Sequence, residues 1–158
     1  MVSGPNLQQQ LQAKVQEVKQ VVTGLNEDQA RKSPTAGEWS AKDVLAHLTN
    51  GETAVQMYEM NRFLEESTPD LGITPGTISE EAARTQSTQQ LLSKFEQQYA
   101  ELGAFFAGLN DEQLGRKAHV PFLKETPLGE YPTLGQWAGA IVNFHLADHL
   151  QQLRNCAQ

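Results

Sequence analysis

The sequence predicts an all-α fold, an up-and-down-type four-helix bundle with a long connection before its last helix. Three observations indicate this fold class. Four long segments carry apolar residues at alternating steps of three and four, which is the period of an amphipathic helix. No segment of comparable length alternates with period two, and stretches with Pro and Gly separate the four segments. A chain of 158 residues can bury a sizeable core, so we expect one domain over residues 1–158.

The first two predicted helices are defined by their apolar stripes and by one clear start signal. The first stripe runs from Leu7 to Leu25. The second helix begins after Ser40, a residue type that caps helices, and Asp43 occupies the third helical position of a capping box. Its stripe continues to Tyr58, and the breaker-rich stretch KSPTAGEW separates the two helices.

The third and fourth predicted helices follow the same logic. The third starts at Thr77, in the stretch TISE, and its stripe ends at Leu109. The fourth begins after Thr133 and extends to Leu153. The connection between them, residues 110–132, is the longest in the chain, and long ordered connections often border functional sites.

A weak internal repeat relates the two halves of the chain. GLNEDQARK at residues 24–32 resembles GLNDEQLGRK at 108–117, and WSAKDVLAHL at 39–48 aligns with WAGAIVNFHL at 137–146. In each half a tryptophan precedes a histidine by eight residues. If a pseudo-two-fold axis relates the halves, the second and fourth helices are equivalent, and His47 and His145 face each other.

Composition excludes several classes of function. The formal net charge is −7 and Lys and Arg form no block, which argues against binding to nucleic acid or to an anionic membrane surface. No apolar run approaches the length of a membrane span, and no apolar signal core follows Met1, so we expect a cytoplasmic protein. Cys156 is the single cysteine, cannot form an internal disulfide and is interpreted as a bystander.

Three of the four histidines indicate a metal site. His145 and His149 are separated by one helical turn, about 40° in rotation and about 6 Å along the axis, so they share one face. His47 lies on the core-facing side of the second helix, and Gly51 leaves space one turn beyond it. Burying imidazole nitrogens without partners costs about 1–3 kcal/mol each. One divalent ion would satisfy all three rings.

The histidines also have other interpretations. A histidine on an apolar face is more often a core residue bonded to a backbone carbonyl, and the chain would then be a metal-free bundle. His119 lies in a loop, where we expect it at the surface near the mouth of the site. The Glu-x-x-His pattern of di-iron bundles, the His-Glu-x-x-His pattern of zincin proteases and the Cys-x-x-Cys-His pattern of haem attachment are all absent from the sequence.

Two motifs carry a resemblance to a known family. The pattern W-x7-H-L at the second helix and T-L-x10-H-x3-H-x2-Q-L, from Thr133 to Leu153, resemble the DinB/YfiT-like family of metalloenzymes. The resemblance implies a four-helix bundle, often a homodimer, with one divalent metal ion such as nickel or zinc on His47, His145 and His149. Known activities of that family include thiol-dependent transferases and isomerases, among them mycothiol-dependent maleylpyruvate isomerases and bacillithiol transferases.

These observations predict a small metalloenzyme, a thiol-dependent transferase or a hydrolase, acting on a small-molecule substrate with a low-molecular-weight thiol as a further cofactor. An ion held by three neutral imidazoles keeps its double positive charge and lowers the pKa of a water or thiol that it binds. The alternative is a non-catalytic bundle in which the metal joins two helices or in which a small molecule is sequestered.

A few other residues are candidates for supporting roles. Asp148 is the candidate catalytic residue, as a hydrogen-bond acceptor for a ligand imidazole or for bound water, with a solvated carboxylate as the alternative. Asn50 and Asn143 flank the ligands and are candidates for orienting substrate. We expect Trp39 and Trp137 to pack the ends of the bundle.

Overall fold

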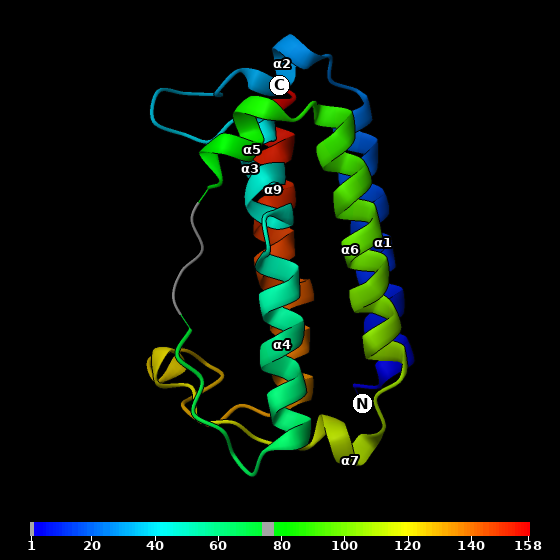
Figure 1. Cartoon of the computed structure of the whole chain (residues 1–158), viewed down its shortest axis with the longest axis vertical. Coiled ribbons are helices and arrows are strands. Elements are labelled where there is room, and N and C mark those ends of the chain that lie inside the picture. The colour runs from blue at the N-terminus through cyan, green and yellow to red at the C-terminus, as the bar shows by residue number, and fades with distance from the viewer. Residues whose placement is uncertain (1, 74–77) are drawn as a thin grey trace.

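Four long helical arms form the bundle in the computed structural model, which describes residues 2–73 and 78–158 (Figure 1). The first arm is α1 (Gly4–Thr23) and the third is α6 (Thr88–Ala107). The second arm is broken into α3 (Ala41–Thr49) and α4 (Glu52–Glu65). The fourth consists of α8 (Leu134–Ala140), a π-helical turn η2 (Ile141–His145) and α9 (Leu146–Cys156). The predicted four-helix bundle is thereby confirmed.

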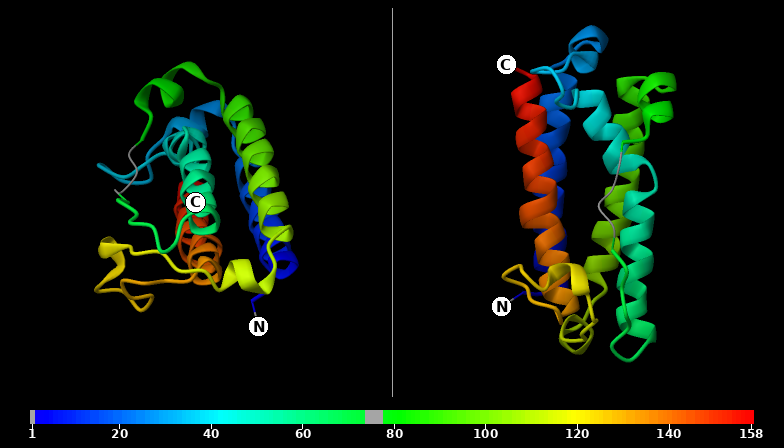
Figure 2. Two further views of the ribbon diagram at one scale, coloured as in Figure 1. Left: turned by 60° about the horizontal axis from the view of Figure 1, so that its bottom comes forward. Right: turned by 90° about the vertical axis from the view of Figure 1, so that its left-hand side faces the viewer.

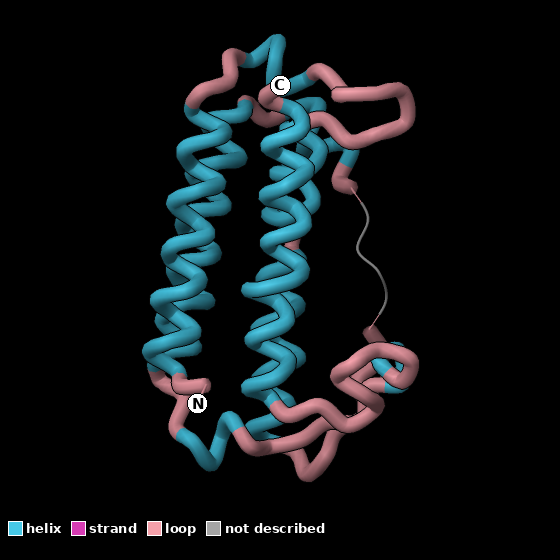
Figure 3. Tube along the Cα trace, turned by 180° about the vertical axis from the view of Figure 1, so that it is seen from behind, coloured by secondary structure: helices cyan, strands magenta, loops and turns pink. Residues whose placement is uncertain are grey.

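Short helices connect the arms. These are α2 (Glu27–Arg31), α5 (Glu80–Thr85), α7 (Asp111–Leu114) and the 3₁₀ turn η1 (Pro121–Leu123). Seen from behind, the described residues contain helices and loops and no strand (Figure 3). No helix within residues 2–73 and 78–158 combines the length and the apolar character needed to cross a membrane.

The arms do not alternate in direction along the chain, so the simple order predicted for an up-and-down bundle is not observed. α1 packs beside α6 and α9, and α3 also packs beside α6 and α9. α1 and the fourth arm run in one direction, whereas the second and third arms run in the other (Figures 1 and 2). α4 therefore ends at one end of the bundle while α5 lies at the opposite end (Figure 1). This order makes the second and fourth arms antiparallel neighbours, which the site requires.

The helix starts follow the predicted caps, with one difference. Ser40 and Asp43 form the capping box of α3, and the predicted start after Thr133 is confirmed at α8. The predicted start at Thr77 lies outside the described residues. Beyond it the third helix is divided, because Ser87 forms a new capping box that begins α6 after the short helix α5.

The internal repeat is also a structural repeat. Asn26 caps α2 through a capping box with Gln29, and Asn110 caps α7 through a capping box with Gln113. Each short helix follows a long arm of 20 residues, α1 or α6. The two GLN motifs therefore have the same role, which is to end one long helix and to turn the chain.

The core lies between the inward faces of the arms. α1 packs beside α6, and the buried residues include Leu7, Leu11, Val18 and Val22 of α1 and Phe95, Tyr99 and Phe106 of α6. α1 begins so close to the end of α6 that a Cβ atom on Gly4 would lie 2.1 Å from the carbonyl oxygen of Phe106. This contact excludes any larger residue at position 4 and holds the two helices at close range.

The long connection before the fourth arm is held to the chain that follows α4. An isolated bridge pairs Asp70 with His119, and the His119 ring stacks on Tyr131 with ring centroids 4.8 Å apart. His119 Nδ1 contacts the carboxylate of Asp70, and Nε2 lies 3.1 Å from Glu130 Oε1. The two carboxylates, first Asp70 and then Glu130, raise the pKa of His119 above its ordinary value. His119 is thus engaged in a loop contact, and no contact within the described residues joins it to the other three histidines.

Candidate metal centre

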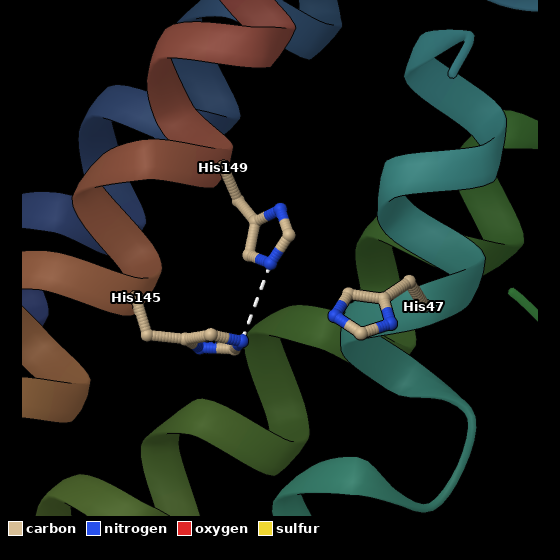
Figure 4. A group of neighbouring side chains, drawn as sticks. All are labelled: His47, His145 and His149. Carbon is tan, nitrogen blue, oxygen red and sulfur yellow. Dashed lines mark hydrogen bonds between the residues drawn. The ribbon is translucent and has the colours of Figure 1, made fainter. Parts of the chain in front are cut away.

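The other three histidines converge between the second and fourth arms. His47 projects from α3, while His145 and His149 project from the fourth arm toward it (Figure 4). Each of the three rings has a nitrogen that lies within 4.8 Å of a nitrogen of both other rings. The Nε2 atoms of His145 and His149 are 3.2 Å apart. The sequence-based expectation that His47 and His145 face each other is met, with ring centroids 5.9 Å apart.

Trp39 lies beside this cluster and does not simply pack a bundle end. Its ring centroid is 5.0 Å from that of His47, and its ring is parallel to His149 at 6.1 Å. His47 is almost fully buried, at 5% exposure, whereas the side chain of His145 is 32% exposed. The cluster is therefore enclosed around His47 and Trp39 and open to solvent around His145.

Gln152 fixes the orientation of His149. The Nδ1 atom of His149 lies 2.7 Å from Gln152 Oε1, and an amide oxygen only accepts, so Nδ1 carries the proton. Burial lowers the pKa of His149 to about 4, against the hydrogen bond to Gln152, which raises it. His149 is consequently neutral at pH 7 with the lone pair of Nε2 directed at the cluster, which is the form that binds a metal ion. Gln152 is the glutamine of the H-x3-H-x2-Q-L motif, and its spacing of three residues from His149 on one helix is the sequence signal for this contact.

The fourth arm is not a continuous α-helix as predicted. A π-helical turn, Ile141–His145, ends at the first histidine of the pair. Single π-helical turns occur mostly inside α-helices and often at functional sites. His145 Nδ1 is buried and has no hydrogen-bond partner among the described residues.

An unpredicted carboxylate, that of Glu52, borders the cluster. Its Oε2 lies 3.1 Å from His47 Nε2 and its Oε1 lies 3.1 Å from His145 Nε2. In an uninterrupted helix, residues five apart differ by about 140° in direction, so the sequence gives no reason to place Glu52 beside His47. The helix is interrupted at Gly51, whose φ of 85° and ψ of −11° are left-handed, and α4 begins anew at Glu52. The break turns Glu52 toward the histidines.

The remaining candidates lie outside the cluster. Asp148 is exposed and makes no hydrogen bond in the described part of the chain, so its catalytic role stays a prediction. Asn50 is exposed and ends α3, and exposed Asn143 donates a hydrogen bond to Gln10. Cys156 is partly buried, and its thiol lies 3.5 Å from the carbonyl oxygen of Trp39. Burial raises the pKa of this thiol, which disfavours a role as a nucleophile.

The donor set suits one divalent cation. In a tetrahedral zinc site with nitrogen ligands about 2.0–2.1 Å from the ion, neighbouring nitrogens lie about 3.3 Å apart. The 3.2 Å between the Nε2 atoms of His145 and His149 matches that spacing. Because His149 is neutral, its nitrogen is available without loss of a proton.

Comparison with known proteins agrees with this geometry. No curated protein sequence matches the chain significantly. Among solved structures, YfiT from Bacillus subtilis is similar, with a TM-score of 0.76 and 21% sequence identity over 97% of this chain and 85% of that one. YfiT is described as a probable metal-dependent hydrolase with an unusual four-helix bundle topology. The model of the DinB superfamily matches residues 10–153. This match spans nearly the whole chain, including all three clustered histidines, and the protein therefore belongs to the DinB superfamily.

Proposed function

We propose that the protein binds one divalent metal ion through His47, His145 and His149 and acts as a metal-dependent enzyme on a small molecule, by hydrolysis or by thiol-dependent group transfer. The observation that supports it is the convergence of three imidazoles from two arms, with nitrogens within 4.8 Å of one another. Three imidazoles gathered this closely offer the three-nitrogen donor set that divalent metal sites use.

The three rings have separate tasks in this proposal. His149 holds its lone pair in place through the hydrogen bond of Nδ1–H to Gln152. His47, almost fully buried, sets the depth of the ion, and His145 leaves one side open to solvent. A divalent ion bound there would lower the pKa of a water or thiol that it contacts, and either product is a nucleophile near pH 7.

A hollow lies beside Trp39 and Gln152, two residues that contact His149. It has a volume of about 260 Å³ and is lined by Pro34, Gly37, Glu38, Trp39, Gln152 and Asn155. No histidine of the cluster is among the described residues that line it, and the exposed ring of the cluster is that of His145. A substrate would therefore reach the ion from the side of His145, and the hollow does not define its size.

Similar proteins support both candidate reactions, hydrolysis and thiol-dependent transfer. The description of YfiT as a probable metal-dependent hydrolase supports hydrolysis. The resemblance to thiol-dependent transferases supports a low-molecular-weight thiol as the second substrate. The same resemblance supports nickel or zinc as the metal and a homodimer as the assembly.

The first test measures metal content and affinity. Elemental analysis of untagged protein is expected to show close to one equivalent of a divalent metal, and His145→Ala is expected to lose it. His119→Ala is the matched control, because His119 lies outside the cluster. Wild-type protein that binds neither zinc nor nickel would overturn the proposal.

The second test measures catalysis. The metal-loaded protein is incubated with chromogenic esters, and separately with low-molecular-weight thiols and an aromatic electrophile. Turnover that disappears in His145→Ala while the far-UV circular dichroism is unchanged would support a catalytic site. Unfolding of the metal-free protein, together with failure of azide to perturb the spectrum of the cobalt-loaded form, would instead indicate a metal that only joins the two arms.

A further inference from the structure

We infer that Glu52 is a fourth protein ligand of the metal ion, so that the centre consists of three imidazoles and one carboxylate. The inference rests on the proposed function, because it concerns the same ion. It adds a residue to the site that the three-histidine pattern does not contain.

The distances from the Glu52 oxygens to the histidine nitrogens fit a ligand of the same ion. Glu52 contacts two of the three histidines, with one oxygen 3.1 Å from His47 Nε2 and the other 3.1 Å from His145 Nε2. Ligand atoms about 2.0–2.1 Å from one ion lie about 3.0 Å apart in an octahedral site and about 3.3 Å apart in a tetrahedral one. The separations of 3.1 Å and the 3.2 Å between His145 and His149 fall in this interval.

The environment of the carboxylate also calls for a cation. The side chain of Glu52 is 18% exposed, and Oε2 is buried without a hydrogen bond in the described part of the chain. No Lys or Arg among the described residues forms an ion pair with it, and its close neighbours are the two imidazoles. A largely buried carboxylate whose close neighbours are imidazoles lacks a permanent positive charge beside it, and a divalent ion at the centre of the cluster would supply that charge.

The backbone is built to present this side chain. Gly51 holds a left-handed conformation, and a Cβ atom added there would meet nothing within 4 Å, so contact with neighbours does not explain the glycine. The left-handed turn instead restarts the helix so that Glu52, its first residue, faces His47.

A fourth ligand of this kind changes the properties of the centre. One carboxylate reduces the net charge of the ion and its ligands from +2 to +1, which weakens its attraction for anionic substrates. An oxygen donor also favours zinc, nickel or iron over cuprous copper, which prefers sulfur ligands.

The inference is tested with Glu52→Gln, which keeps the shape of the side chain and removes its charge. Zinc affinity is measured by competition with a chromophoric chelator, and the visible spectrum is recorded on cobalt-loaded protein. The matched control is Glu65→Gln, at the exposed end of the same helix. We expect Glu52→Gln to weaken zinc binding by more than about 100-fold, beyond the 10–100-fold typical of a lost indirect partner, and to alter the cobalt spectrum.

The outcomes separate the inference from the proposed function. If wild-type protein binds no metal, the metal centre itself is refuted. If wild-type protein binds metal and Glu52→Gln gives an unchanged cobalt spectrum, the carboxylate is not a ligand, whatever the change in affinity, and the three-histidine site stands without it. Circular dichroism of the metal-free variants shows whether each is folded before its affinity is compared.

Discussion

Replacing Gly51 with Ala should weaken both the fold and the metal centre, and the two effects can be separated. Gly51 has a φ of 85°, and an added Cβ atom would meet nothing within 4 Å. The cost is therefore backbone strain alone, about 1–2 kcal/mol for an L-residue in the left-handed region. For a chain of this size each 1 kcal/mol lowers Tm by about 2–4 °C, so we expect a decrease of about 2–8 °C.

The strain can be relieved only by changing the turn that positions Glu52. Alanine favours the helix, and an uninterrupted α3–α4 helix would direct residue 52 about 140° away from His47. We therefore expect Gly51→Ala to lower zinc affinity at least tenfold. The free energy of unfolding is measured in urea with a chelator present, and zinc affinity by competition.

Gly129→Ala is the control for the Gly51 experiment. Gly129 has a φ of 70° and also has nothing within 4 Å of an added Cβ atom, but it lies in the connection before the fourth arm. It should lose a similar amount of stability and retain full zinc affinity. Equal zinc affinity in wild-type protein and both variants would refute the role of the break in placing Glu52.

Three further predictions concern other polar contacts. Gln152→Leu should lower zinc affinity by about 10–100-fold without unfolding the protein, because His149 loses the acceptor that fixes its ring, as titration calorimetry would show. Glu27→Gln should lower the free energy of unfolding by about 2 kcal/mol at pH 7, because Lys42, which is 2% exposed, loses its partner at 2.7 Å. Hydrogen bonds from Lys42, and next from Thr88, lower the pKa of Glu27 from 4.5 to about 2. The stabilisation that the Glu27–Lys42 pair provides should therefore disappear as the pH falls from about 4.5 to about 2. His119→Gln should lower stability most below about pH 6.5, because its raised pKa makes the charged form stabilising there, and the difference should vanish as the pH rises through the folded-state pKa.

Each of these predictions has a control or a contrary result. Gln151→Leu changes the neighbouring exposed glutamine and should leave zinc affinity unchanged. A Glu27→Gln protein as stable as wild type in urea would show that Lys42 reaches water or another acceptor. If the stability difference caused by His119→Gln is the same at pH 6 and pH 9, the imidazole contributes by packing on Tyr131 and not by its charge.

Much of the fold could be predicted from the sequence because helices are local structures. The apolar stripes outlined the arms, and the capping residues Ser40 and Thr133 located the starts of the second and fourth. The GLN repeat anticipated two equivalent halves, and the structure shows the same capping box in both. The division of the third helix was not predicted. Ser87 and Gln90 form the capping box of α6, but serine also occurs inside helices, so its presence alone does not show that a helix starts there.

The sequence by itself determined which residues could meet at the centre: His145 and His149 share a helical face by spacing, and the repeat paired His145 with His47. Glu52, Gln152 and Trp39 belong to the site for reasons that depend on three-dimensional arrangement. A left-handed turn at Gly51 redirects Glu52, and antiparallel packing of the second and fourth arms sets the distance between the rings. Periodicity describes one helix at a time, whereas the spacing between ligands on different helices is a property of their packing, and only the tertiary structure decided it.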